Sequence, residues 1–434
     1  MNKLLVVFMM FLFTNQIIDD SEWWKKRYED DQLNEVIDRV LKNDSTYIDS
    51  ILETKKALFT LSKITNSLLP SLLLKGQASI GTTHNDTQDN KKQSSISGEI
   101  KGNYELDYAG KKNNVQIIQN YEYEICKLNQ QNAKSLLIYN TIEYYYKLSY
   151  INEIIHDMDD LIIHMDKVLE VMKQKREYGI INSQDDFINY ISSFIQSKEK
   201  YIQLKTLYEE SVRSLIVSLY SSKIGDKSYN SELSMLKNTK KLSDIQDSYI
   251  DSDFKIDLIN NRNDVKIAKL NMQKVFKKIK KNEIRFLPTI NLNGTISKNI
   301  LNLSNPMNWL GMISIEFPLL DWLSIKNDVK ISKAEYIQTK NKFIRVFNSA
   351  MLDIKSKYTS YDENRKLYDT MKQMYEQVLS KYNAKCNEHT LGLLNDESFT
   401  KLTNEYIDCK LQFLTSKYNM IKAELDYYRS ISGV

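Results

Sequence analysis

The side chains best able to do chemistry lie far apart in this sequence. Long stretches of other residues separate the four histidines, His84, His156, His164 and His389. The sequence holds no Ser, His and Asp set spaced for nucleophilic catalysis, and no glycine-rich phosphate loop after a strand. His156 and His164 are two helical turns apart, but such a pair on a helix rich in Tyr and Asp usually faces solvent. The pattern argues against an enzyme, a cofactor and a metal site.

Cysteine content and charge exclude further classes. Cys126, Cys386 and Cys409 are too few and too scattered for a disulfide framework or a zinc site. The 60 basic and 56 acidic side chains nearly cancel, so no strong field favours nucleic acid. We expect no nucleic-acid partner.

Two short segments each combine an isolated glycine, an aliphatic pair and nearby carboxylates. They read YGIINSQDD (residues 178–186) and LGLLNDES (residues 391–398). Glycine can hold the positive φ of a tight helix reversal, which presses the next two residues against a neighbouring surface. A purely structural helix cap explains the glycines equally well, but exposed aliphatic pairs are costly unless covered. The segments therefore predict docking at Gly179, Ile180, Ile181, Gly392, Leu393 and Leu394.

The carboxylates beside these glycines predict a second property. Repeated around an oligomer, they would gather negative charge and favour cations at a pore entrance. The candidate residues are Asp185, Asp186, Asp396 and Glu397.

The scarcity of glycine and proline predicts the elements that position these segments. The chain holds only 11 Gly and 4 Pro, and most of them lie in residues 70–110 and 288–318. No Gly or Pro interrupts the chain from the first window to Gly179, or from the second to Gly392. Each interval predicts a helix of about 100 Å at about 1.5 Å per residue. Apolar residues recur along one side of such a helix every three or four positions, and this apolar seam must pack against other helices along its whole length.

Three pairs of similar segments, each about half the chain length apart and in the same order, indicate a tandem duplication. The pairs are LPSLLLKG with LPTINLNG, KNNVQI with KNDVKI, and GIINSQ with GLLNDE. Each half therefore reads as a strand pair, a long helix, a turn at an isolated glycine and a returning helix.

The two glycine- and proline-rich windows alternate apolar and polar residues with a period of two. Such strands, apolar on one side and hydrated on the other, are typical of a transmembrane β-barrel. An amphipathic sheet on a soluble core is the alternative, but the remaining helices already pack along their own seams. We expect loops 82–97 and 298–309 outside the cell, and a lipid face of Tyr104, Leu106, Ile290, Leu292, Ile296, Ile313, Ile315 and Phe317.

Four strands leave two open edges, which lipid cannot satisfy, so the strands must be pooled with copies of the chain. A dimer would close eight strands and a trimer twelve, and spacing alone does not choose between them. At the N-terminus, Lys3 and the apolar run of residues 4–13 predict an export signal peptide at residues 1–18.

Taken together, these features resemble the TolC-like outer-membrane efflux protein family over essentially the whole mature chain. The similar segments are RFLPTINLNG, GMISIEFPLLDW, DQLNEVIDRVLKNDSTY and the turns at Gly179 and Gly392. The chain departs from the family pattern at PLLDWL (residues 318–323), where the family often has two glycines, and it holds fewer alanines. Among the acidic positions past the two glycines, Asp185 matches, but Ser398 and Lys401 stand where the second half's acidic ring would be expected.

The resemblance implies a mainly α fold with a small β part. Tandem long helical hairpins would form a trimeric α-barrel, and each chain would add four strands to a shared twelve-stranded transmembrane barrel. The implied partners are two more copies, outer-membrane lipid, a periplasmic adaptor protein and an inner-membrane transporter. The chain would be a passive exit duct of a tripartite efflux pump or type I secretion system in the outer membrane, extending into the periplasm, with no readable cargo.

The expected segments follow the same plan. After the signal peptide come an equatorial and helical segment (19–69), a β-hairpin (70–110), a helical hairpin (111–225), an equatorial segment with a helix (226–287), a second β-hairpin (288–320) and a second helical hairpin (321–434). The main alternative is a secreted or surface coiled-coil scaffold. A periplasmic adaptor is a weaker alternative, because adaptors carry one hairpin rather than two.

Overall fold

The computed structural model describes residues 23–85, 88–179, 184–220, 240–247, 250, 257–300 and 306–433. The expected signal peptide lies outside these residues. The first half contains α2 (Trp23–Tyr28), α3 (Asp31–Asn43), α4 (Ser45–Asn66), β1 (Ser71–Asn85), β2 (Gln88–Glu105), α5 (Lys111–Glu177) and α6 (Gln184–Tyr220). The second contains η1 (Leu242–Asp244), α8 (Asp257–Asn261), α9 (Asn263–Ile284), β3 (Thr289–Asn299), β4 (Asn308–Glu316), α10 (Trp322–Thr390) and α11 (Asp396–Ser432).

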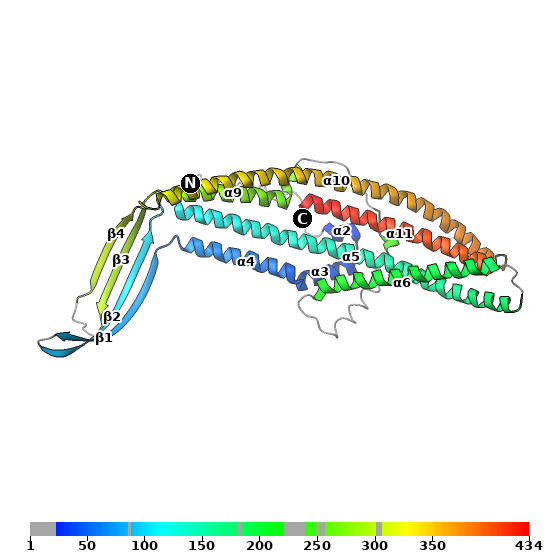
Figure 1. Ribbon diagram of the computed structural model, residues 1–434, viewed down its shortest axis with the longest axis horizontal. Coiled ribbons are helices and arrows are strands. Elements are labelled where there is room, and N and C mark those ends of the chain that lie inside the picture. The colour runs from blue at the N-terminus through cyan, green and yellow to red at the C-terminus, as the bar shows by residue number, and fades with distance from the viewer. Residues whose placement is uncertain are drawn as a thin grey trace. The chain divides into compact units, whose positions relative to one another are not determined.

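The predicted duplication is confirmed in the element order (Figure 1). Before the strands, α4 and α9 have 22 residues each. After the strands, α5 has 67 residues and α10 has 69. The returning helices α6 and α11 have 37 residues each. The two helices that breaker positions predicted are therefore continuous over the expected intervals.

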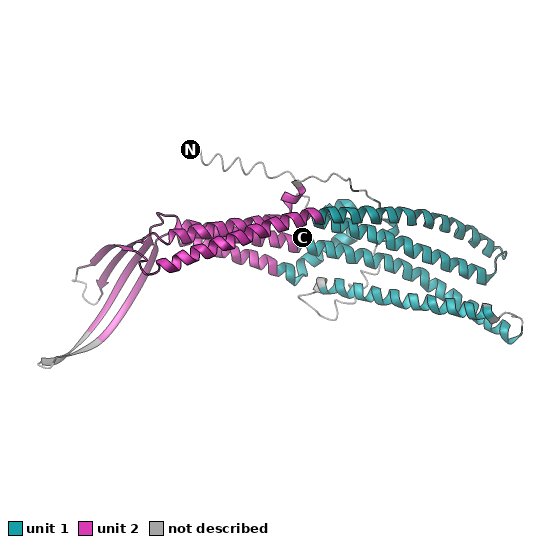
Figure 2. Cartoon of the chain, turned by 45° about the horizontal axis from the view of Figure 1, so that its top comes forward, with its two compact units in different colours: residues 1–48, 134–254, 353–431 teal, residues 49–133, 255–352, 432–434 magenta. Residues whose placement is uncertain are grey.

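The chain divides into two compact units, coloured separately in Figure 2. Unit 1 contains residues 1–48, 134–254 and 353–431, and unit 2 contains residues 49–133, 255–352 and 432–434. Unit 2 holds the whole sheet and the helical segments next to it. Unit 1 holds both helix-hairpin turns.

The four strands form one antiparallel sheet in the order β1-β2-β3-β4. The first hairpin is longer than the sequence predicted, because β1 continues to Asn85 and β2 begins at Gln88. The expectation of a loop over residues 82–97 is therefore wrong. Ile96 is the only apolar residue in this part of the sequence, so hydrophobic alternation could not reveal the strands, whereas backbone pairing such as Thr82 with Lys92 continues the ladder.

The helical segments of unit 2 follow the same order as the strands. Thr54 of α4 donates a hydrogen bond to the carbonyl of Cys126 in α5. Lys274 of α9 lies 2.8 Å from Glu122 of α5. Asn282 of α9 donates to Ser332 of α10 at 2.7 Å. The neighbours thus run α4, α5, α9 and α10.

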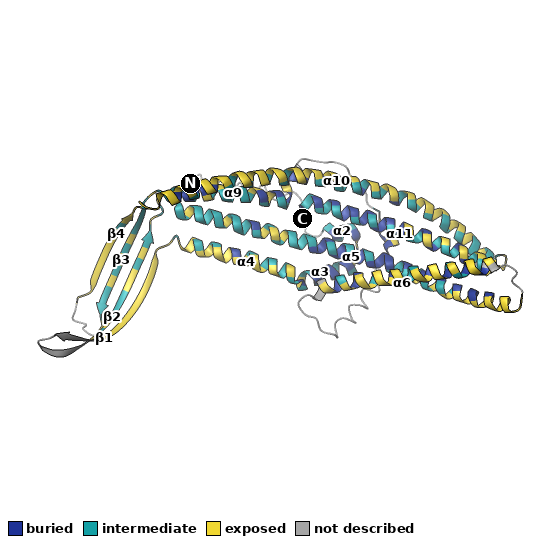
Figure 3. Ribbon diagram, in the orientation of Figure 1, coloured by how far each residue is buried: buried dark blue, intermediate teal, exposed yellow. Residues whose placement is uncertain are grey.

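Unit 1 contains most of the buried apolar side chains, shown dark blue in Figure 3. Its largest fully buried side chains come from α5, α3 and α10 and include Tyr145, Tyr146, Leu33, Ile151 and Tyr361. The Asp30 carboxylate starts α3 by accepting hydrogen bonds from the backbone of Gln32 and Leu33. No described helix combines the length and apolar character of a membrane-spanning helix.

Candidate functional site

The strand register gathers apolar side chains on one face of the sheet. Directly paired residues of antiparallel strands share a face. The register places Tyr104, Leu292 and Ile313 in one cross-strand row, and pairs Ile290 with Ile315 in another. Ile296 heads a third row, while Leu106 and Phe317 lie just beyond the strand ends. Six of the eight predicted lipid-face residues therefore lie within the sheet on the same face.

The same face includes residues that the sequence reasoning missed. Leu72 and Leu74 of β1 pair with Gly102 and Ile100, and Trp309 of β4 pairs with Ile296. Trp309 is 81% exposed and Ile313 is 70% exposed. The apolar run SLLLKG concealed the alternation in β1. Leu72, Leu74, Leu292 and Ile296 are exposed as well, whereas Lys112 Nζ lies over the Tyr104 ring, 5.8 Å from its centroid.

The opposite face of the sheet is mainly polar. Glu99, Lys101, Asn103 and Glu105 of β2 alternate with the apolar residues and share this face with Asn291, Asn293, Thr295 and Ser297 of β3. Lys101 lies 3.2 Å from Glu99. The exceptions are Leu73, Leu310 and Met312, which the register also puts here. A sheet with one apolar and one hydrated side matches a barrel wall between lipid and water.

The two outer strands leave backbone groups unpaired within the described residues. β1 pairs only with β2, and β4 pairs only with β3. In lipid, each unsatisfied backbone group costs several kcal/mol. A sheet of this kind placed in lipid therefore needs further strands at both edges.

The turns of both helical hairpins have the predicted backbone conformation. Gly179 has φ of 70° and Gly392 has φ of 73°. After α10, the N–H of Gly392 bonds to the carbonyl of His389 and that of Leu393 bonds to Glu388, both at 2.9 Å, which is the Schellman arrangement. Asn395 then begins α11 by accepting a hydrogen bond from the N–H of Ser398 at 2.8 Å. Each turn therefore needs glycine.

The predicted docking residues can be placed only in part. Leu393 is 74% exposed, whereas Leu394 is half-buried. Ile180 and Ile181 lie outside the described residues. Both turns lie at the same end of unit 1 in Figures 1 and 2. Two exposed residues beside them, Tyr178 and Leu391, were not predicted and add to the apolar surface.

The returning helices of the two hairpins contact one another near these turns. Asn404 of α11 donates to Ser193 of α6 at 3.1 Å and accepts from Ser197 at 3.2 Å. Lys200 forms an ion pair with Asp408. The helices that carry the two turns, one from each repeat, are therefore packed against each other.

The acidic candidates have basic neighbours in the structure. Asp396 Oδ1 lies 2.9 Å from His389 Nε2, and Glu397 lies 3.1 Å from Lys401. Asp185 is exposed at the start of α6. The side chain of Asp186 is not among those described. The Lys401 ammonium reduces the negative field of the second turn, so a role in cation selection stays a prediction.

We expect Asp396→Asn with Glu397→Gln to weaken cation selectivity, because two carboxylates are lost from each copy around the pore entrance. The reversal potential of single channels in planar bilayers under a salt gradient measures this change. Lys401→Gln is the opposite control and should strengthen cation preference by freeing Glu397. Unchanged selectivity in the double variant would show that these carboxylates do not border the pore.

A ladder of stacked rings joins α10 to α11 between the turn and the middle of the hairpin. Ring centroids are 4.1 Å apart for His389 and Phe399, and 4.4 Å for Tyr382 and Tyr406. The ladder continues through Tyr375 and Phe413, at 4.7 Å. Its rings recur every seven residues, at Tyr368, Tyr375, Tyr382 and His389 on one helix and Phe399, Tyr406 and Phe413 on the other. This spacing is the signal that could have revealed the ladder.

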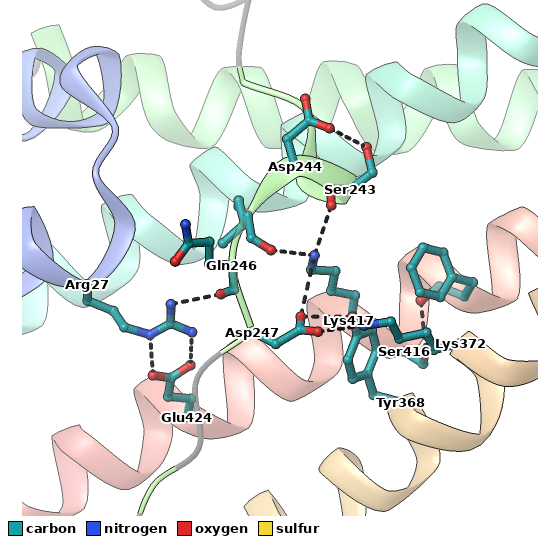
Figure 4. A network of polar contacts seen from close by, with 12 residues as sticks. Arg27, Ser243, Asp244, Gln246, Asp247, Tyr368, Lys372, Ser416, Lys417 and Glu424 are labelled. Atoms are coloured by element: carbon teal, nitrogen blue, oxygen red, sulfur yellow. Dashed lines mark hydrogen bonds and ion pairs between the residues drawn. The ribbon is translucent and has the colours of Figure 1, made fainter. Parts of the chain in front are cut away.

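A buried polar network fastens residues 243–247 to α10 and α11 of unit 1 (Figure 4). Lys417 Nζ donates to the carbonyls of Ser243 and Ile245 at 3.1 and 2.7 Å. Asp247 accepts from Tyr368 at 2.8 Å and from Lys372 at 2.9 Å. Burial lowers the pKa of Lys417, although Asp247 opposes the shift.

Arg27 of α2 joins the same region from the other end of the chain. Its Nε and Nη2 donate to the two carboxylate oxygens of Glu424 at 2.8 and 2.9 Å. Its Nη1 donates to the carbonyl of Gln246 at 3.1 Å. The N-terminal segment is thereby held against the last helix.

We expect Asp247→Asn to lower the free energy of unfolding at pH 7 by about 1 to 3 kcal/mol, since Lys372 and Lys417 lose their anionic partner. Burial alone would raise the pKa of Asp247, but hydrogen bonds from Lys372 and Tyr368 and the charge of Lys417 hold it below the usual 3.8. A carboxyl with a depressed folded pKa contributes stability above the unfolded value and loses it as pH falls through the folded value. Chemical denaturation followed by circular dichroism should therefore separate the two proteins at pH 7 more than in strong acid, where the folded-state carboxyl of Asp247 is protonated. An equal difference at both pH values would contradict the ionic role.

No family model matches the chain. A curated relative, toxin and drug export protein A of Aggregatibacter actinomycetemcomitans, is 23% identical over 430 residues, which cover 97% of this chain and 90% of the relative.

Solved channels share the fold across nearly the whole chain. The Campylobacter jejuni CmeC outer membrane channel superposes with a TM-score of 0.78 at 17% identity, covering 95% of this chain and 88% of that one. The open state of the Neisseria gonorrhoeae MtrE outer membrane channel has a TM-score of 0.76 at 16% identity, covering 94% and 91%. The resemblance inferred from sequence is thereby confirmed at the level of the fold.

Proposed function

We propose that this chain, which has the fold of the TolC-like outer-membrane channels, is one subunit of an outer-membrane export duct that extends into the periplasm. The duct performs no chemistry and conducts substrates passively. The sheet is the main support for the proposal, because most of its apolar face is exposed and its two edge strands have no second partner among the described residues. Lipid would cover the face, and copies of the chain would satisfy the edges.

The matching order of strands and helices supports a closed ring. In unit 2, β1 and α4 form one edge, and β4 and α10 form the other. Both helical edges expose apolar residues seven positions apart: Leu52 and Phe59 on α4, and Ile337, Ile344 and Met351 on α10. Two different edges that meet make a head-to-tail interface, which forms a ring when the rotation between successive copies closes. The ring we propose is the trimer that the family resemblance implies.

The ring predicts a specific contact between copies. Leu52 lies about 21 Å before the sheet end of α4, and Ile337 lies about 22 Å beyond the sheet end of α10, at about 1.5 Å per residue. We expect the double variant Leu52→Cys with Ile337→Cys to form disulfide-linked trimers under oxidation, seen by non-reducing electrophoresis. The control Leu52→Cys with Leu352→Cys should stay unlinked, because Leu352 lies about 45 Å from the same end. Linkage in both variants would contradict this register.

The proposed duct serves a tripartite efflux pump or a type I secretion system. An inner-membrane transporter supplies the driving force, and an adaptor protein docks at the turns around Gly179 and Gly392. A relative named for toxin and drug export and neighbours named as outer membrane channels support export. The polar sheet face supports a wet lumen, and no feature of it selects one cargo class.

Membrane fractionation tests the proposal. The full chain should remain in the outer-membrane fraction after carbonate and high salt, enter detergent, and cross-link as trimers. A secreted coiled-coil scaffold, the main alternative, would be released by carbonate. Release of this kind would overturn the proposed function.

A further inference from the structure

An exposed apolar segment joins the sheet to α10. We name Phe317, Leu319, Leu320, Trp322 and Leu323 the junction patch. Leu320 is 98% exposed and Leu319 is 83% exposed, and the other three are also exposed. Four of these five residues lie in the PLLDWL stretch (residues 318–323), which contains no glycine. Monomeric proteins rarely leave such a run of large apolar residues uncovered.

The patch continues the apolar face of the sheet. Ile313 and Ile315 point to that face from β4, and Phe317 follows at the same alternation. Trp322 lies edge-on to Phe286, with ring centroids 6.1 Å apart, and keeps most of its surface exposed. An amphipathic ring beside an apolar band is typical of a membrane–water interface.

Two lysines follow the patch on one face of α10. Lys326 and Lys330 lie three and seven residues beyond Leu323, which places all three side chains on the same side of the helix. Both lysines are exposed and form no ion pair within the described residues. At about 1.5 Å per residue they lie about 4.5 and 10.5 Å further along the axis. The headgroup layer is roughly 5 to 8 Å thick on each side. Lys326 lies within that thickness, and the Lys330 side chain leans back toward it because helical side chains tilt toward the N-terminus.

Charge argues against a second copy as the cover. In the proposed ring, the sheet end of α4 from the next chain lies beside this part of α10. Residues 57–69 there contain Lys63 and no carboxylate. This segment of the next chain could cover the apolar side chains of the patch, but it would place the positive charge of Lys63 near Lys326 and Lys330.

Within the proposed function, we propose that the junction patch with Lys326 and Lys330 is a binding site for anionic phospholipid headgroups. The patch lies at the acyl boundary of the leaflet that faces the helices. The two ammonium groups bind the phosphate, and their preference is for lipids with net negative charge.

Spin-labelled lipids test the site on the full-length chain reconstituted into phosphatidylcholine vesicles. The electron paramagnetic resonance spectra of spin-labelled phosphatidylglycerol and phosphatidylcholine give their relative association with the protein. We expect phosphatidylglycerol to be preferred, and each of Lys326→Gln and Lys330→Gln to reduce this preference by up to about five-fold. The matched control Lys340→Gln removes one exposed lysine charge further along α10, as each test variant does, and should leave the preference unaltered.

The outcomes separate the site from the proposed function. Wild-type protein that fails to insert into vesicles would overturn the duct itself. Inserted protein with no lipid preference, or with equal loss in the control variant, would overturn the lipid site alone. The remaining alternative is that a second copy of the chain covers the patch, and Leu320→Gln tests it. If this variant loses trimers on electrophoresis, and the two lysine variants keep the wild-type lipid preference, the patch is an interface between copies instead.

Discussion

Replacing Leu393 with aspartate is expected to abolish export while leaving trimers in the outer membrane. Leu393 is 74% exposed at the turn between α10 and α11, and its backbone, not its side chain, closes the turn. A charge there leaves the fold intact but would be buried without a partner against the docked adaptor. Such a loss costs several kcal/mol at the centre of an interface, which is enough to prevent docking.

Export can be measured as dye accumulation in cells that lack another channel of this fold. Leu393→Met keeps the apolar surface and should export like the wild type. Outer-membrane trimer levels should be equal in all three proteins. Unchanged export in the aspartate variant would contradict the docking proposal, whereas loss of trimers would reveal a structural role for the turn.

Gly179→Pro tests the other repeat by a different physical route. Proline holds φ near −65°, far from the 70° that this turn requires, and it has no N–H to donate to the carbonyl of Arg176 at 3.0 Å. We expect export to be lost because the docking surface is displaced, while the sheet in the other unit and the trimer persist. Normal export would show that the first turn does not dock.

Local periodicity explains why the elements could be predicted from the sequence. Two helices appear where Gly and Pro are absent, and both turns appear where a single glycine returns. Residues such as Leu292 and Ile313 were assigned to one face from alternation alone, and the register confirms that they share it. In each case the sequence pattern, a glycine, the absence of breakers or an alternation of apolar residues, belongs to the same local segment as the helix, turn or strand that it predicts.

Contacts between distant residues could not be predicted in the same way. Arg27 and Glu424 pair across almost the whole chain, and Lys417 binds carbonyls whose identity no side-chain pattern encodes. The strands of the first hairpin also extend into the predicted loop, because backbone hydrogen bonds continue through a stretch of sequence that is almost entirely polar. These contacts and the length of the hairpin depend on tertiary packing and strand register, which local sequence patterns do not encode.

Arginine at Ile313 is expected to destabilise the assembled channel by about 2 to 4 kcal/mol per chain, the usual cost of a cation at the middle of a barrel's lipid face. Ile313 lies near the centre of β4, is 70% exposed, and shares its row with Leu292 and Tyr104. The bilayer core offers the guanidinium no water and no counter-charge. Each copy in a ring carries the same cost, so the loss multiplies with the number of subunits.

The neighbouring residue provides a matched control. Ser314 lies on the same strand but faces the polar side, opposite Asn291, so Ser314→Arg should leave the arginine in a hydrated lumen and cost little. Urea titration of protein folded into lipid vesicles, followed by tryptophan fluorescence and electrophoretic mobility, compares the two variants. Equal destabilisation would mean that arginine harms the strand on either face. No loss at Ile313 would mean that this face does not meet lipid, and the sheet would need a protein cover instead.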